Sequence, residues 1–90
     1  MIARIPDKVL LCITDNINGL QFDIELPSQM PACDLSEGVL RLLQDYAPTR
    51  YARYTTVELW TANKKLLANQ TLASEKIWDG SELFLIFPHD

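Results

Sequence analysis

The segment D-L-S-E-G-V-L-R-L-L-Q-D-Y-A-P, residues 34–48, carries the clearest helix pattern in the sequence. Its apolar residues recur at helical spacing and form one stripe, which consists of Leu35, Val39, Leu42, Leu43 and Tyr46. Asp34 and Glu37 have the spacing of a capping box at the start of the helix, and Pro48 stops it at the other end. A single amphipathic helix cannot bury its stripe alone, so we expect it to lie on a sheet.

Two strand patterns precede the helix. In the segment L-Q-F-D-I-E-L, residues 20–26, apolar and polar residues alternate, which is typical of a strand with one buried face and one wet face. Residues 9–14 form a short apolar run that predicts a buried strand. The residues between them, 15–19, tolerate left-handed backbone and predict a hairpin loop.

Three more strands are predicted after the helix, at residues 56–61, 65–67 and 82–87. The first and last strands of the chain have no polar residue on their inner face, so we expect them to be central and paired with each other. A hairpin, a helix and then further strands predict an α+β domain in which one helix crosses one face of a mixed sheet.

Length and composition set the domain organisation. The chain has 90 residues, of which 48% are hydrophobic, and this suffices for one two-layer core. We expect a short lead-in over residues 1–7, a single domain over residues 8–87 and a tail over residues 88–90. The net charge of −4 argues against broad attraction to nucleic acid or to anionic lipid.

The sequence also bears on the compartment. No apolar run approaches the roughly 18 residues that a membrane span needs, and the N-terminal residues lack the pattern of a signal peptide. Cys12 and Cys33 are too few and too irregularly placed for a disulfide framework. We therefore expect a reduced, cytoplasmic domain that does not insert into a membrane.

The order and spacing of these elements resemble ubiquitin and its β-grasp relatives. Four segments carry the likeness: L-Q-F-D-I-E-L, the following P-S, L-W-T-A-N-K-K-L with T-L five residues beyond it, and I-W-D-G-S-E-L-F-L-I near the end. Within that superfamily, the D-G-S-E-L-F-L-I ending and the short length look most similar to the YukD/EsaB family, small ubiquitin-like proteins associated with type VII secretion systems of Gram-positive bacteria.

That resemblance implies a fold and a role. The fold is a ubiquitin-like β-grasp, with four to five strands packed on one helix. The role is that of a non-enzymatic, cytoplasmic accessory or regulatory factor that works through protein contacts, with a component of the secretion machine as a candidate partner.

A second class of function among β-grasp proteins is the carrier or modifier, whose C-terminal Gly-Gly is activated as an adenylate or a thioester. This sequence ends I-F-P-H-D and has no glycine beyond Gly80. The bulky ending argues against conjugation and sulfur transfer, and the carrier function is kept as the alternative.

Candidate catalytic and metal-binding residues are sparse. His89 is the only histidine and lies one residue from the end, where an imidazole is not held for catalysis. Together with Cys12 and Cys33 it shows no metal-ligand spacing. Cys12 is interpreted as a small apolar filler, whereas Cys33 lies just before the predicted helix, where a redox role is the minor alternative. We expect no catalytic site, no metal and no cofactor.

Arginines alternate with tyrosines between Tyr46 and Tyr54. Such a cluster can stack on and neutralise single-stranded nucleic acid. Because the chain is acidic, we favour instead a solvated loop whose tyrosines cover the end of the helix.

The outer face of the sheet gives the strongest functional signal. If the leucines of the strands at 56–61 and 82–87 point to the helix, then Trp60, Phe84 and Ile86 point away from it, because strand side chains alternate. Ile17 at the hairpin tip extends this group, and Leu10 lies further along the same face. In ubiquitin the matching positions form the apolar face that partners recognise.

We predict that this group binds a protein partner through Trp60, Phe84, Ile86 and Ile17, with Lys64 and Lys65 at its rim. The partner could be a second copy of the chain, in a symmetric dimer. The alternatives are that residues 49–56 or the N-terminal residues fold over this group, or that it makes only a crystal contact.

Overall fold

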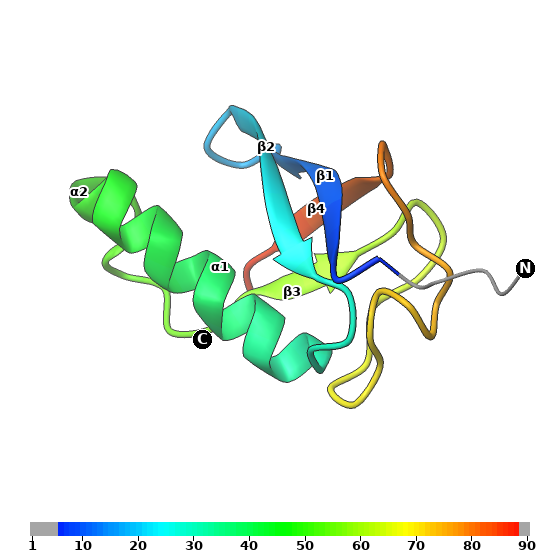
Figure 1. Cartoon of the computed structure of the whole chain (residues 1–90). Coiled ribbons are helices and arrows are strands. Elements are labelled where there is room, and N and C mark those ends of the chain that lie inside the picture. Colours follow the sequence, from blue (N-terminus) through cyan, green and yellow to red (C-terminus); the bar gives the residue numbers. More distant parts are fainter. Residues whose placement is uncertain (1–5, 89–90) are drawn as a thin grey trace, which may run out of the picture.

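The computed structural model describes residues 6–88 of the chain. A four-stranded sheet with the order β2-β1-β4-β3 carries a helix across one of its faces (Figure 1). The elements in chain order are β1 (Lys8–Asp15), β2 (Leu20–Pro27), α1 (Ala32–Tyr46), α2 (Pro48–Tyr51), β3 (Glu58–Trp60) and β4 (Glu82–Ile86).

The two central strands are β1 and β4, and they run parallel to each other. The hairpin partner β2 and the short strand β3 are antiparallel to them and form the two edges. This arrangement confirms the predicted pairing of the first and last strands. The strand predicted at residues 65–67 forms only one isolated bridge, between Trp60 and Lys65, because the chain turns away after it.

Side chains alternate across the sheet as the sequence predicts. The inward side chains of β1, β3 and β4 are buried against α1 and the connections; they are Val9, Leu11, Ile13, Leu59, Leu83 and Leu85. On β2 the alternation holds, but Leu20, Phe22 and Ile24 are only half-buried, because this strand forms the edge of the sheet.

The start of α1 differs from the prediction. The helix begins at Ala32, two residues before Asp34, and no side chain caps it. The carbonyl of Gln70 accepts the N–H of Ala32, and the carbonyl of Ala68 accepts the N–H of Cys33. The predicted capping box is therefore wrong, because the helix starts two residues earlier than expected. Asp34 lies inside the first turn, where its own backbone N–H donates to the carbonyl of Pro31, and it does not occupy the cap position.

The buried face of α1 is also rotated from the predicted stripe. Leu35, Val39 and Leu43 are buried as expected, and Leu40 joins them. Leu42 and Tyr46, which were assigned to the stripe, are 44% and 72% exposed. The two side chains lie on the flank of the helix, where β2 ends the sheet and no further strand covers them.

Pro48 does more than end α1, because it begins the short helix α2. This helix carries Tyr51 into the core, where it is fully buried and its hydroxyl donates to Asp15 Oδ2 at 2.7 Å. Tyr54 stacks on Phe87 with 4.0 Å between the ring centroids. The predicted solvated loop is thus wrong for Tyr51, whereas Arg50 and Arg53 do lie at the surface.

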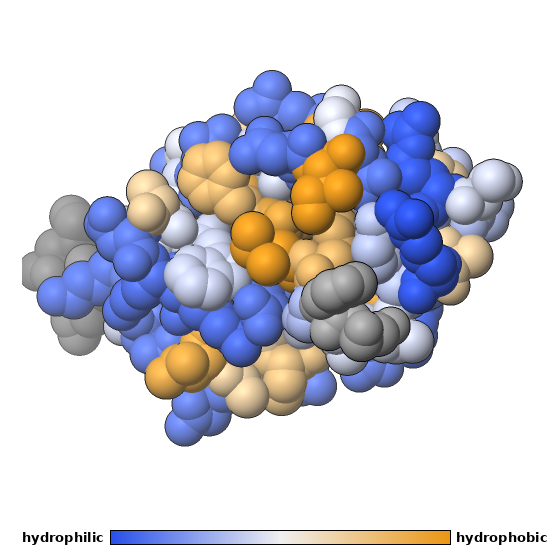
Figure 2. Space-filling view, turned by 180° about the vertical axis from the view of Figure 1, so that it is seen from behind, coloured by the Kyte–Doolittle hydropathy of each residue, from blue (hydrophilic) through white to orange (hydrophobic). Residues whose placement is uncertain are grey.

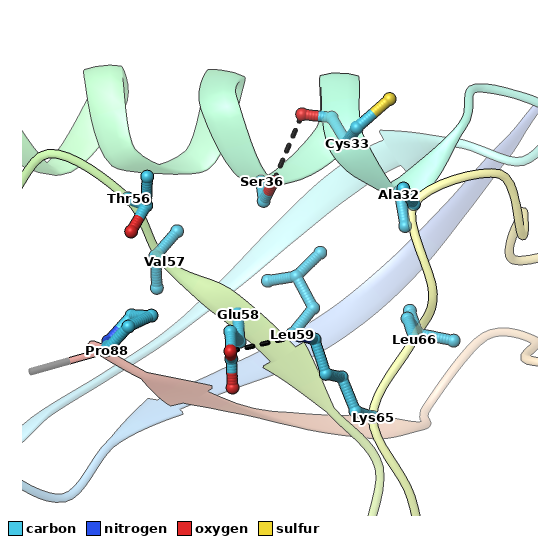
Figure 3. Close-up of a pocket in the computed structure, with 11 residues that line it drawn as sticks. Ala32, Cys33, Ser36, Thr56, Val57, Glu58, Leu59, Lys65, Leu66 and Pro88 are labelled. Carbon is cyan, nitrogen blue, oxygen red and sulfur yellow. Dashed lines mark hydrogen bonds and ion pairs between the residues drawn. The ribbon is translucent and has the colours of Figure 1, made fainter.

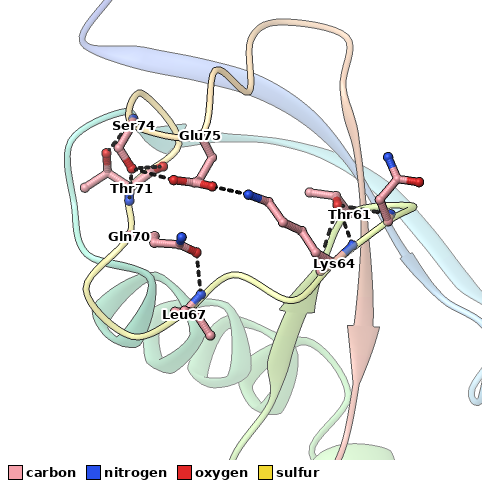
Figure 4. A network of polar contacts seen from close by, with 8 residues as sticks. Thr61, Lys64, Leu67, Gln70, Thr71, Ser74 and Glu75 are labelled. Atoms are coloured by element: carbon pink, nitrogen blue, oxygen red, sulfur yellow. Dashed lines mark hydrogen bonds and ion pairs between the residues drawn. The ribbon is translucent and has the colours of Figure 1, made fainter.

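The long connection between β3 and β4 is anchored at three buried side chains, Leu66, Leu72 and Ile77. Polar contacts hold its surface (Figure 4): Lys64 pairs with Glu75, and Thr71 and Ser74 hydrogen-bond each other. Within the part of the chain that the structure describes, neither helix is long and apolar enough to cross a membrane. The prediction for His89 lies outside the described residues.

Candidate protein-binding face

The register of the sheet brings two aromatic residues together on its outer face. Trp60 of β3 lies directly opposite Phe84 of β4, and Phe84 in turn lies beside Thr14 of β1. Because the neighbouring Leu59, Leu83 and Leu85 are buried, Trp60 and Phe84 face away from α1. Ile86 lies two residues further along β4 on the same face and is 42% exposed.

Trp60 is held in one orientation by its neighbours. Its indole N–H donates to Glu58 Oε1 at 3.0 Å, and Lys65 Nζ pairs with Glu58 Oε2 at 3.0 Å. The hydrogen bond from Trp60 and then that from Lys65 lower the pKa of Glu58 below its ordinary value. The aromatic residue is therefore bordered by a polar cluster that includes Lys65, one of the two lysines predicted at the rim.

Lys64, the other predicted rim lysine, has a different neighbour. It pairs with Glu75 in the connection between β3 and β4 (Figure 4). On the side of β1, Trp60 and Phe84 are bordered by the polar residue Thr14, whose hydroxyl donates to Glu82 Oε2 at 3.1 Å.

Ile17 lies on the turn between β1 and β2 and is 61% exposed. Asp15 holds the turn, because its Oδ1 accepts hydrogen bonds from the backbone N–H groups of Ile17 and Asn18 at 3.0 and 3.1 Å. The parallel register of β1 and β4 places Ile86 level with the start of this turn. Ile17 and Ile86 therefore lie at the same end of the sheet, and we call Trp60, Phe84, Ile86 and Ile17 the outer patch.

Of the two alternative covers for the outer patch, only residues 49–56 lie within the described part of the chain, because residues 1–5 lie outside it. Residues 49–56 pack Tyr51 toward the core and leave Ile17 and Ile86 exposed. Figure 2, which views the molecule from the side opposite to Figure 1, shows hydrophobic residues gathered near the middle of that face and hydrophilic residues around them. An apolar centre with a polar border is the usual layout of a protein-binding surface.

A cavity of about 260 Å³ lies between the first turns of α1 and β3 (Figure 3). Cys33 lines it and is exposed, with its Sγ 3.9 Å from Asp34 Oδ1, and the Glu58–Lys65 pair lies on the opposite wall. The lining residues include no histidine. Across residues 6–88, no three His, Cys, Asp or Glu side chains are grouped as a metal ion would need. The redox role of Cys33 stays an untested alternative.

Sequence reasoning missed one apolar surface. A groove of about 280 Å³ runs between β2 and α1 and is lined by Leu20, Gln21, Phe22, Leu42, Leu43 and Tyr46. The signal was present in the sequence, because Leu42 and Tyr46 are four residues apart and form their own line along the helix. It was overlooked because both were assigned to the core.

Solved structures with similar folds include domains of bacterial secretion systems. The EccD5 ubiquitin-like domain from Mycobacterium xenopi matches with a TM-score of 0.75 and 18% identity, over 94% of this chain and 99% of that one. The ubiquitin-like domain of the Mycobacterium tuberculosis type VII secretion system protein EccD1 has a TM-score of 0.68 and 16% identity, over 88% and 97% of the two chains.

A chain of the MycP5-free ESX-5 inner membrane complex also matches, with a TM-score of 0.76 and 18% identity. The alignment covers 94% of this chain and 22% of that one. At these identities the likeness shows the fold, and it confirms the predicted ubiquitin-like β-grasp.

Among curated protein sequences, none matches the chain. A family model, described as WXG100 protein secretion system (Wss), protein YukD, matches residues 9–85. The match spans nearly all of β1 and of β4 and every helix and strand between them. The chain therefore belongs to the YukD family, the ubiquitin-like proteins of WXG100 protein secretion systems.

Proposed function

We propose that this chain is a non-enzymatic accessory or regulatory factor of a WXG100 secretion system. It acts in the cytoplasm by binding a protein partner through the outer patch. The observation that carries this proposal is the pairing of Trp60 and Phe84 on the outer face of the sheet, with exposed Ile86 beside them.

The outer patch has the physical features of a binding surface. Trp60 and Phe84 are half-buried, so they offer rigid apolar area and lose little side-chain entropy when a partner covers them. Ile17 and Ile86 are exposed and gain the most from being covered. The ion pair of Glu58 and Lys65 at the border restricts the ways in which a partner can align.

A component of the secretion machine is the proposed partner. The family description names a secretion system, and the same fold occurs within one chain of the ESX-5 inner membrane complex. A second copy of the chain is the other occupant that we consider for the outer patch, because the same apolar surface on two copies can pair in a symmetric dimer.

The test compares two substitutions of the same kind in full-length protein. Ile86→Asp places a charge in the outer patch, and Leu67→Asp places one on a loop near the start of α1, where the leucine is 55% exposed. Each tagged variant is used to capture partners from lysate of the native bacterium, and captured proteins are identified by mass spectrometry. Melting temperatures of both variants check that the fold is retained.

We expect secretion-machine components with the unchanged protein and with Leu67→Asp, and their loss with Ile86→Asp. Equal capture by both variants would contradict the role of the outer patch. Sedimentation of the purified protein tests the other occupant. A dimer that Ile86→Asp dissociates would identify a second copy of the chain as the occupant of the outer patch.

A further inference from the structure

Strand β2 is an edge strand whose outward backbone groups can be assigned. The N–H of Ser28 donates to the carbonyl of Asp7, which fixes the phase of hydrogen bonding along the β1–β2 pair. Bonded and non-bonded pairs alternate in an antiparallel ladder. It follows that Gln21, Asp23 and Glu25 direct their N–H and C=O groups away from β1, along the open edge of the sheet.

Next to this edge lies the apolar groove between β2 and α1. Its walls are Leu20 and Phe22 on the strand side and Leu42, Leu43 and Tyr46 on the helix side. An unpaired strand with an adjacent apolar groove is the combination that recognises extended peptides, because the backbone supplies hydrogen bonds and the groove takes every second side chain.

The charges on β2 indicate which kind of segment fits. Asp23 and Glu25 are exposed on the face of β2 that points away from the groove, and neither is in an ion pair with another described residue. Lys8 is the only basic residue on β1 and β2. Added side chains on that face of the sheet would lie beside two carboxylates, so basic residues are favoured there.

The same charges disfavour a second copy of β2 as the occupant. In a symmetric antiparallel pair centred on Asp23, that carboxylate would lie opposite its own copy, and Glu25 would lie opposite Gln21. Like charges directly opposite each other destabilise a strand pair. Such repulsion also protects the free edge against self-association.

We propose that β2 and its groove form a second docking site, which takes an extended segment of a partner protein as an added strand of the sheet. The segment alternates apolar residues, which enter the groove beside Phe22 and Leu42, with basic residues beside Asp23 and Glu25. This site lies at the β2 edge of the sheet, whereas Trp60, Phe84 and Ile86 of the outer patch lie on β3 and β4, and it does not depend on them.

The probe is a synthetic peptide, acetyl-Lys-Val-Lys-Ile-Lys-Val-Lys-amide, added to the full-length ¹⁵N-labelled protein. In the free protein, we expect the amide hydrogens of Gln21, Asp23 and Glu25 to exchange faster than those of Phe22 and Ile24. The peptide should shift the amide signals of β2 and of Leu42 and slow the exchange of those three amides.

Two controls separate strand addition from simple charge attraction. A peptide with alternate amides N-methylated keeps its charge but loses backbone hydrogen bonds on one edge, and a weakening of Kd by about tenfold or more is expected. The double substitution Asp23→Lys with Glu25→Lys should reverse the preference, so that the same peptide with Glu in place of Lys binds instead.

A matched pair of variants tests the groove. Leu42→Asp should weaken peptide binding by about tenfold or more, whereas Leu67→Asp and Ile86→Asp should leave the Kd unchanged. Equal binding of the N-methylated peptide, shifts confined to the outer patch, or β2-mediated dimers without peptide binding would each overturn the proposal. Because Ile86→Asp is a control here, failure of this site and failure of the outer patch give different results.

Discussion

Replacing Tyr51 with phenylalanine removes one hydroxyl group from the buried contact between α2 and the turn after β1. That hydroxyl donates to Asp15 Oδ2 at 2.7 Å, and both side chains are fully buried. A hydrogen bond to a charged group contributes about 1.5–3 kcal/mol to stability. Asp15 still accepts three other hydrogen bonds, from the N–H groups of Ile17 and Asn18 and from the Asn18 side-chain amide.

Because those three donors remain, we place the cost of Tyr51→Phe toward the lower part of that range, at about 2 kcal/mol. For a domain of this size, such a loss lowers the melting temperature by on the order of 10 °C. The same contact braces the turn that carries Ile17, so the outer patch should also lose partner affinity.

The assay is urea unfolding, and Tyr54→Phe is the matched control. Tyr54 loses the same hydroxyl group, but its oxygen only accepts a hydrogen bond from the exposed Arg53. We expect the control to cost less than about 1 kcal/mol, since exposed polar contacts contribute little. Equal losses in the two variants would refute the stabilising role assigned to the contact between Tyr51 and Asp15.

Tyr51→Phe should also change how the stability of the protein depends on pH in the alkaline range. Burial, followed by the hydrogen bond to Asp15 and its negative charge, raises the pKa of Tyr51 above its ordinary value of 10.0. The unfolded chain therefore releases this proton at lower pH than the folded chain does. The stabilisation is complete below about pH 10 and falls as the pH rises further. In Tyr51→Phe this alkaline loss should be smaller than in Tyr54→Phe, and equal slopes would contradict the prediction.

Three other substitutions test separate parts of the fold. Leu72→Ala should cost about 2–5 kcal/mol in urea unfolding, because the side chain is fully buried; an unchanged stability would place it outside the core. The contacts of Glu58 lower its pKa from 4.5 in the folded chain, so Glu58 contributes stability that is lost as the pH falls below 4.5. Glu58→Gln should remove this acid-dependent loss of stability, and an unchanged acid profile would argue against the contacts of Glu58. Gly80→Ala should cost about 1–2 kcal/mol at a backbone φ of +87°, whereas no loss would mean that the turn relaxes.

Which residues face the helix could be predicted from the sequence because strand side chains alternate with a period of two. Leu59, Leu83 and Leu85 are buried as expected, and this fixes Trp60 and Phe84 on the outer face. This alternation depends only on neighbouring residues, so the facing of each side chain could be predicted without the tertiary structure.

The start of α1 could not be predicted in the same way. Its first N–H groups bond to carbonyls of Ala68 and Gln70, which are more than thirty residues away in the sequence. Local capping patterns such as Asp34 with Glu37 carry no information about such distant partners.

Tyr51 illustrates a signal that was present but not used. Asp15 continues the parity of Val9, Leu11 and Ile13 and so lies on the inner face of β1. A buried carboxylate needs hydrogen-bond donors, and a tyrosine in the polar segment after the helix is one of the few side chains able to supply one. The groove at Leu42 and Tyr46 was missed for a different reason, since helical periodicity alone does not show where the sheet ends.

Photo-crosslinking in the native bacterium tests the central claim most directly, with a photoreactive phenylalanine analogue at position 86 in one strain and at position 67 in another. We expect position 86 to crosslink to a component of the secretion machine and position 67 to give no such product. A secretion component crosslinked from position 67 but not from position 86 would contradict the assignment of the outer patch as the partner-binding face.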